Sequence, residues 1–175
     1  MSEENSFLYA EYAKPITKKG KYGRLRLLLI LSYVIVGAAY AAFFVSVHIP
    51  HFIAILPLLL WMLVYFTWGT VSFEIRVKTE SGLLTIEKLC GKKAKVLYSV
   101  KIKELSTVEI YAPQRLTAIA PHLALDHRAD PHSSASYLAL HEKDGKKTVL
   151  LFEATDAVLK IIRYYNEEAI RLEKE

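Results

Sequence analysis

Charged residues are missing from a long internal stretch of this chain. No Asp, Glu, Lys or Arg occurs between Leu27 and Phe73, although the whole chain has 23 basic and 18 acidic residues and a net charge of +5. A soluble domain rarely keeps so many consecutive positions uncharged, because its exposed faces need polar cover. The stretch therefore argues against a soluble fold for this region and indicates membrane helices.

Cysteines and glycosylation signals are also scarce. Cys90 is the single cysteine, so the chain forms no internal disulfide. No Asn-x-Ser/Thr acceptor occurs, because Asn5 and Asn166 are followed by other residues. Both absences fit a cytoplasmic domain.

Sequence signatures of catalysis are lacking as well. The chain has no Gly-x-Ser-x-Gly nucleophile elbow, and Gly91-Lys92 is not preceded by a phosphate loop, since Gly82 lies nine positions away. The aromatic residues do not interleave with basic residues as they do on single-strand nucleic-acid surfaces. We therefore expect a non-enzymatic protein that needs no cofactor and binds no nucleic acid.

The uncharged stretch divides into two apolar runs, residues 27–48 and 52–70, on either side of Pro50. Roughly 20 helical residues, at about 1.5 Å each, cross a hydrocarbon core of about 30 Å. Trp61 and Trp68 lie toward the far end of the second run, and such rings prefer the membrane interface. We predict a two-helix transmembrane hairpin over residues 27–70.

Basic residues flank both ends of the uncharged stretch, and the short connecting loop has none. The positive-inside rule places such flanks in the cytoplasm. We therefore expect a multi-pass protein of the cell membrane with both termini cytoplasmic and with residues 1–26 as a basic cytoplasmic segment.

Small residues four positions apart mark one side of the first run, Gly37 with Ala41 and Ala38 with Ala42. Such residues let helices approach closely. We expect them to pack inside the hairpin, and the alternative is a homo-oligomer formed through the Gly37/Ala41 face.

The pattern changes to a period of two after Val71, as in Phe73, Ile75 and Val77. This alternation predicts half-buried strands, and about seven of them follow over residues 71–175. The Asp144-Gly145 pair predicts a hairpin turn. A helix is expected from about Thr155 to Leu172, with Thr155 as its N-cap.

Antiparallel strands closed by a C-terminal amphipathic helix resemble the pleckstrin-homology-like (PH-like) pattern. The segments that carry this resemblance are Phe73-Glu-Ile-Arg-Val, Gly82-Leu-Leu-Thr-Ile-Glu-Lys, the Gly91-Lys-Lys turn, Val100-Lys-Ile-Lys-Glu-Leu and Phe152-Glu-Ala-Thr. More narrowly, the chain resembles bacterial PH-like domains that follow a pair of membrane helices. The resemblance implies an α-helical transmembrane hairpin followed by an α+β barrel or sandwich, and a membrane-tethered scaffold or binding domain without catalysis. The long segment 114–135 departs from the pattern.

That segment is rich in groups that ligate metals. Its three imidazoles and two carboxylates are His122, Asp126, His127, Asp130 and His132. Such groups bind zinc or similar ions. The alternative function is thus a metal-dependent sensor or enzyme, although the spacing matches no known metalloenzyme motif.

A second candidate site is a run of basic residues in the middle of the predicted strands. It consists of Lys92, Lys93, Lys95, Lys101 and Lys103. Lysines beside a bilayer attract anionic headgroups. We therefore expect a basic face that binds lipid or an unknown protein partner at the membrane.

Overall fold

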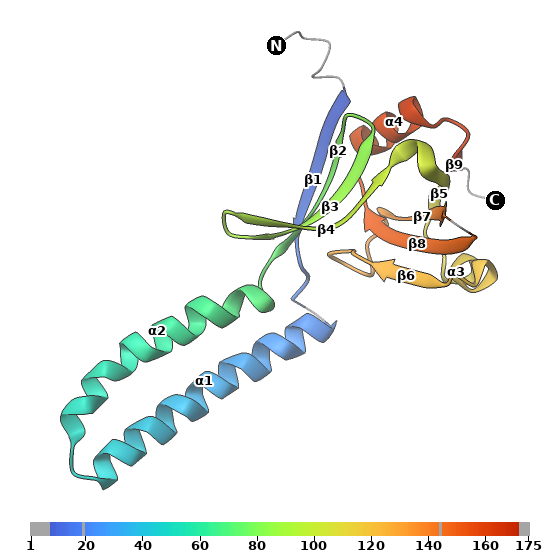
Figure 1. The fold of residues 1–175 in the computed structure, drawn as a ribbon. Helices are drawn as coiled ribbons and strands as arrows, with labels where there is room; N and C mark the ends of the chain where they lie inside the picture. Colours follow the sequence, from blue (N-terminus) through green and yellow to red (C-terminus); the bar gives the residue numbers. More distant parts are fainter. Residues whose placement is uncertain (1–7, 19, 144, 172–175) are drawn as a thin grey trace, which may run out of the picture. The chain divides into compact units, whose positions relative to one another are not determined.

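The computed structural model describes residues 8–18, 20–143 and 145–171. The chain divides into two compact units, one formed by residues 17–73 and the other by the segments before and after it. The strands and the C-terminal helix belong to the second, which we call the sheet unit; residues 17–73 form the helical unit (Figure 1).

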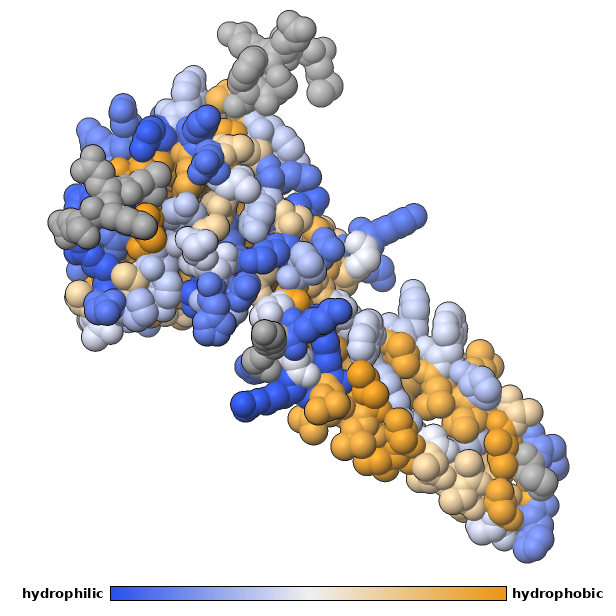
Figure 2. All heavy atoms as spheres, turned by 180° about the vertical axis from the view of Figure 1, so that it is seen from behind, coloured by the Kyte–Doolittle hydropathy of each residue, from blue (hydrophilic) through white to orange (hydrophobic). Residues whose placement is uncertain are grey.

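The helical unit is a hairpin of two apolar helices. Its elements are α1 (Gly20–Ser46), η2 (Pro50–Ile55), α2 (Leu56–Thr67) and η3 (Trp68–Thr70). Both candidate spans, Lys21–Ser46 and His51–Thr70, are long and apolar enough to cross a membrane. Almost none of their residues are buried, and Figure 2 shows a broad apolar surface over them. A core helix of a soluble protein would bury such a surface.

Polar groups within the hairpin are paired across the two helices. The Tyr33 hydroxyl lies 2.5 Å from the Thr67 hydroxyl, and Arg26 Nε donates to the Val71 carbonyl at 2.7 Å. Gly37 faces Leu60, because a Cβ built on Gly37 would lie 3.5 Å from Leu60 Cδ1. The small residue therefore serves packing inside the hairpin, and this side of α1 is occupied by the hairpin's own second helix.

The sheet unit contains two sheets. The first has the order β1-β2-β3-β4 and is antiparallel throughout; its strands are β1 (Tyr9–Pro15), β2 (Glu74–Glu80), β3 (Leu83–Cys90) and β4 (Lys93–Lys101). The second has the order β6-β8-β7-β5-β9; its strands are β5 (Leu105–Ile110), β6 (Leu123–Asp126), β7 (Ser136–Lys143), β8 (Lys146–Glu153) and β9 (Ile170–Arg171). Helices η4 (Ile102–Glu104), α3 (Pro113–Ile119) and α4 (Asp156–Tyr165) complete it.

This architecture confirms the predicted strand-rich domain with a helix near its C-terminal end, and it corrects the strand count and the barrel. Nine strands occur among the described residues rather than about seven, and those strands form two sheets without closing a barrel. The turn residue Asp144 lies outside the described residues, but β7 and β8 pair on either side of it. The last helix is shorter than expected: it ends at Tyr165, and Leu172 lies outside the described residues.

Strand β1 is the main departure from the expected domain boundaries. The segment 1–26 was expected to be a basic cytoplasmic segment separate from the PH-like domain, but Tyr9–Pro15 pairs along its whole length with β2. The sheet unit therefore begins before the helical hairpin and resumes after it, rather than starting at Val71. The two helices are an insertion between adjacent strands.

Alternate residues of the strands are buried in the interior of the sheet unit. Ile75, Val77, Leu84 and Ile86 are buried on the first sheet, and Phe152 is buried on the second. Helix α4 adds four buried apolar side chains, Val158, Leu159, Ile161 and Ile162. Burial of one such side chain contributes about 1.5–3 kcal/mol, so α4 is a large part of the stability of the sheet unit.

The segment 114–135, expected to be a long loop, has structure of its own. Helix α3 lies over the second sheet, where Leu116 and Ile119 pack against buried Leu138, Val149 and Leu151. Strand β6 then pairs in parallel with β8. The segment is long because it covers the second face of a sheet whose first face already lines the core.

Candidate functional site

The register of the first sheet defines which of its ends connects to the helices. Pro15 pairs with Glu74, and Glu74 pairs with Leu89. The chain leaves for the helical unit after Pro15 and returns at Glu74, and the β3–β4 turn at Gly91-Lys92 follows two residues after Leu89. We call this the helix-linked end of the sheet; the β2–β3 turn at Ser81-Gly82 marks the far end.

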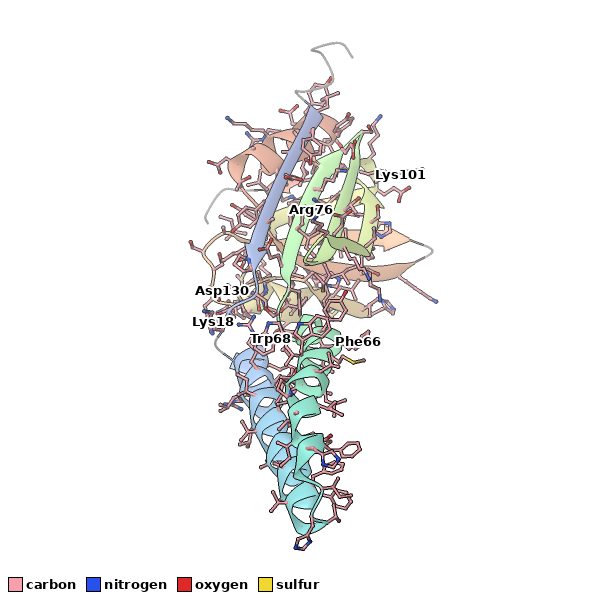
Figure 3. The ribbon with its side chains drawn as sticks, turned by 90° about the vertical axis from the view of Figure 1, so that its left-hand side faces the viewer. Lys18, Phe66, Trp68, Arg76, Lys101 and Asp130 are labelled. Carbon is pink, nitrogen blue, oxygen red and sulfur yellow. The ribbon has the colours of Figure 1, made fainter. Side chains whose placement is uncertain are left out.

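The five lysines of the predicted basic face do not share one surface. Lys92, Lys93 and Lys95 lie at the helix-linked end and are exposed. Lys101 pairs with Leu83 at the far end, and Lys103 follows in η4, whose Ile102 N–H donates to the Gly82 carbonyl at 2.8 Å. Figure 3 shows Lys101 and Asp130 toward opposite ends of the sheet unit. The antiparallel return of β4 separates residues that are close in sequence.

The β3–β4 turn and the residues flanking it, 89–96, form what we call the basic tip. In Figure 1 it projects away from the rest of the sheet. Lys93 pairs with Cys90, and Lys95 pairs with Lys88, whose partner on β2 is Ile75. The two lysines therefore lie on the same face of the sheet as Ile75. Leu89, Ala94 and Val96 lie on the opposite face, and Val96 is 55% exposed. The tip is thus basic on one face and apolar on the other.

Two carboxylates lie in register with the apolar face of the tip, exposed Glu74 opposite Leu89 and Glu87 opposite Val96. Glu87 accepts from Arg76 Nε at 2.8 Å and from the second guanidinium nitrogen as well. Arg76 also lies 3.7 Å from Glu11 on β1. These ion pairs form a row across the outer face of the first sheet, so Glu87 does not offset the charge of the tip lysines.

The predicted metal ligands are not brought together. Among the described residues, no three His, Cys, Asp or Glu side chains converge as a metal site requires. The ring Nδ1 of exposed His122 accepts from the backbone N–H of Lys147 at 3.3 Å. The backbone N–H of exposed His132 donates to Asp130 Oδ1 at 3.1 Å. Asp126 binds Arg128 instead of a shared ion.

The Asp126–Arg128 pair holds the connection between β6 and β7. Arg128 Nε and Nη2 donate to the two Asp126 oxygens at 2.9 and 2.6 Å, and Nη1 donates to the Pro131 carbonyl at 3.2 Å. The guanidinium carbon lies 4.3 Å from the centre of the Tyr111 ring. Partial desolvation alone would raise the pKa of Asp126, but the hydrogen bonds and the charge of Arg128 lower it overall.

Arg128→Lys should therefore destabilise the sheet unit although it keeps the charge. The Arg128 side chain is 6% exposed, and a lysine cannot donate to both carboxylate oxygens in one plane or stack on Tyr111. We expect the free energy of unfolding to fall by about 2 kcal/mol. Urea unfolding would measure it, with Arg163→Lys on the exposed side of α4 as the control; equal effects of the two substitutions would contradict the structural role.

Sequence reasoning missed Glu153, a buried acidic residue with three hydrogen-bond donors. It is 2% exposed at the end of β8 and accepts from Lys14 Nζ at 2.7 Å. The N–H groups of Ala129 and Asp130 donate to its other oxygen at 3.0 and 3.3 Å. Glu153 thus joins β1, β8 and the loop after β6 near the helix-linked end. A buried carboxylate with a partner 139 positions away leaves no local sequence signal.

A model of the bacterial PH-like domain family (DUF6106) matches residues 8–172. This chain belongs to that family. The match includes both β1 and the helical hairpin, so the inserted helices lie within the family's own sequence pattern. No curated protein and no solved structure matches the chain. PH-like domains are generally non-catalytic interaction domains.

This PH-like domain also contains a cluster of polar side chains that no motif indicated. The Tyr98 hydroxyl of β4 lies 3.2 Å from His141 Nδ1 of β7, and His141 Nε2 lies 3.6 Å from a Glu104 oxygen. Burial raises the pKa of Tyr98, and the Glu104 charge raises it further. The cluster links the two sheets across the β4 side.

His127 should make the stability of the PH-like domain depend on pH. Its Nε2 is buried without a hydrogen-bond partner, and burial lowers its pKa despite the nearby Asp126 charge. Protons therefore bind His127 more readily in the unfolded chain than in the folded chain. The free energy of unfolding should then fall as the pH drops below 6.5, the ordinary pKa of histidine.

His127→Gln should remove this part of the pH dependence. We expect the difference in unfolding free energy between the variant and the original chain to change as the pH falls from neutral to about 5, in favour of the variant. Urea unfolding at a series of pH values measures it, with His132→Gln, an exposed site in the same loop, as the control. Parallel curves for the original chain and His127→Gln would contradict the effect of burial.

Proposed function

We propose that this chain is a membrane-anchored, non-enzymatic interaction domain whose two helices cross the membrane as a hairpin. The support is the combination of family membership with two apolar helices that remain uncovered. In water their exposed side chains, such as Leu27, Trp61 and Phe66, would be costly, whereas hydrocarbon accommodates them.

The pairing of β1 with β2 carries the proposal. These strands precede and follow the helices, and Pro15 and Glu74 are register partners. If only one helix crossed the membrane, the two strands would lie on opposite sides of a hydrocarbon core about 30 Å thick and could not pair. The ladder therefore favours two crossings. It also argues against a cleaved signal peptide, since cleavage after α1 would remove β1.

The orientation follows from charge. Basic residues precede Leu27 and follow Phe73, whereas the turn between the helices carries only the histidines His48 and His51. The positive-inside rule then places the sheet unit and both termini in the cytoplasm and the turn outside.

The ion pairs of Asp126, in the predicted metal loop, and of Glu153, at the end of β8, support an interaction role rather than catalysis. Asp126 is paired with Arg128, and Glu153 with Lys14 and two backbone N–H groups. A catalytic carboxylate needs to reach a substrate. These carboxylates hold the fold together, and the exposed surfaces remain for binding a partner.

The test is a topology map of the full chain in intact and permeabilised cells. In a Cys90→Ser background, His51→Cys should react with a membrane-impermeant maleimide from outside, and Ser106→Cys should react only after permeabilisation. The protein should also stay in the membrane at alkaline pH. Extraction into the soluble fraction would overturn the anchoring, and labelling of Ser106→Cys in intact cells would overturn the orientation.

A further inference from the structure

We propose that the basic tip, residues 89–96, docks on the anionic headgroups of the membrane that holds the chain. This inference depends on the proposed anchoring and adds a partner to it. Its basis is the presence of three exposed lysines, Lys92, Lys93 and Lys95, at the end of the sheet from which the helices depart.

Chain length brings the tip within reach of the headgroups. The second candidate span ends at Thr70, and β2 begins at Glu74. Four residues extend at most about 14 Å. Leu89 is the partner of Glu74, and the turn lies two strand positions farther toward the same end, about 7 Å. The first connection is six residues long, since β1 ends at Pro15 and the first span starts at Lys21, and it extends at most about 20 Å.

Two short connections restrict the sheet more than one would. Strands β1 and β2 are each tied to a helix at neighbouring register positions, Pro15 and Glu74. The two connections therefore limit how far the helix-linked end can move from the bilayer. The lysines of the tip are thereby held at a high effective concentration near the headgroups.

The chemistry of the tip matches an anionic interface on both faces. Lys93 and Lys95 present positive charge on one face, and Lys92 presents it at the turn. On the other face Val96 is 55% exposed beside Ala94. A surface with basic and apolar sides binds at the boundary between headgroups and acyl chains. Lys101 and Lys103, at the far end, are excluded from this contact.

Two alternative roles for the tip lysines lead to different outcomes. Lysines on an edge strand can serve only to prevent pairing with other strands, in which case lipid charge would not matter. The same lysines could bind an acidic segment of a protein, in which case the tip would engage that protein and not the bilayer. Charge and position favour the membrane, because it is the anionic surface that the tethers keep close.

The experiment places a fluorophore on the tip of the full chain in lipid nanodiscs. In a Cys90→Ser background, Val96→Cys carries an environment-sensitive dye, and Ser106→Cys carries it at the far end as the control. The discs contain phosphatidylcholine alone or mixed with phosphatidylglycerol, with a headgroup-attached nitroxide as the quencher. Lys92, Lys93 and Lys95 are replaced together by Gln in one variant, and Lys101 and Lys103 in the matched control.

We expect strong quenching of the Val96→Cys dye in anionic discs, weak quenching in neutral discs, and little change at Ser106→Cys. Each lysine near an anionic surface favours contact about fivefold, so the triple variant should weaken the docking equilibrium on the order of 100-fold. Lys101 and Lys103 replacement should leave it unchanged. High salt should release the tip.

Equal quenching in neutral and anionic discs, or no effect of the triple substitution, overturns the docking. Failure of the chain to enter discs of either composition would instead overturn the anchoring, so the two proposals fail separately.

Discussion

A chain that begins at Val71 is expected not to fold, whereas residues 8–16 joined to Glu74 by a short turn should fold without the helices. Strand β1 supplies Ala10 to the core, the Lys14 partner of Glu153 and a full ladder with β2. Antiparallel register partners have Cα atoms about 4.5–5.5 Å apart, so a turn of a few residues connects Pro15 to Glu74. Far-ultraviolet circular dichroism and amide dispersion in nuclear magnetic resonance spectra measure the outcome.

The control is the linked chain with Ala10→Asp. Ala10 is 9% exposed on the core side of β1, so an unpaired charge there should unfold the linked chain. The change has no effect if β1 is dispensable. A folded, monomeric chain starting at Val71, or an unfolded linked chain, would show that the helices rather than β1 complete the sheet unit.

The missed strand shows where sequence reasoning reached its limit. The hairpin was predictable because forty-seven uncharged positions are a local signal, and β2 and β3 were predictable because buried Ile75, Val77, Leu84 and Ile86 alternate with polar residues. Strand β1 has only Ala10 buried, and its inward-facing Lys14 breaks the alternation. Its partner also lies beyond the whole helical insertion.

The buried face of the last helix was predicted correctly, but its C-terminal end was not. Val158, Ile161 and Ile162 are buried as the helical spacing required. Asn166 ends the helix, because its side-chain amide donates to the Ile102 and Leu105 carbonyls at 3.0 and 2.9 Å. These acceptors lie about sixty positions earlier, so no pattern near Asn166 indicated the stop.

The candidate sites were limited by the same lack of long-range information. Composition identified Asp126 and Asp130 as possible ligands, but only the fold shows that Arg128 occupies Asp126. Proximity in sequence grouped Lys101 with Lys93, and the register places them at opposite ends of one strand. The spatial grouping of these residues therefore depended on strand pairing and long-range contacts, which no local pattern indicates.

Glu153→Gln should cause the largest loss of stability from a single polar substitution in the sheet unit. The carboxylate is buried and accepts from three donors, and an amide of the same size loses the charge and places an N–H₂ group among them. Removing one partner of a buried ion pair costs about 3–5 kcal/mol; Lys14 is partly exposed and can turn toward water, so we expect about 3 kcal/mol.

Neutral pH is the right condition for measuring this loss. Burial alone would lower the pKa of Lys14, but the hydrogen bond and charge of Glu153 raise it overall, above its ordinary 10.5. The stability that this pair contributes is then fully present below pH 10.5 and lost as the pH rises through the folded value.

Hydrogen-exchange mass spectrometry of the full chain would detect the effect of Glu153→Gln as lost protection in β8 and the loop after β6. Exposed Glu80→Gln, whose partner is Lys78, is the matched control, and it should change stability by less than about 0.5 kcal/mol. In a double-mutant cycle, the double variant Lys14→Met, Glu153→Gln should lose less stability than the sum of the losses of the two single variants. Each single substitution leaves the remaining member of the ion pair without its partner, and the double substitution does not. Additive effects would mean that Glu153 acts through the backbone N–H groups of Ala129 and Asp130 and not through β1.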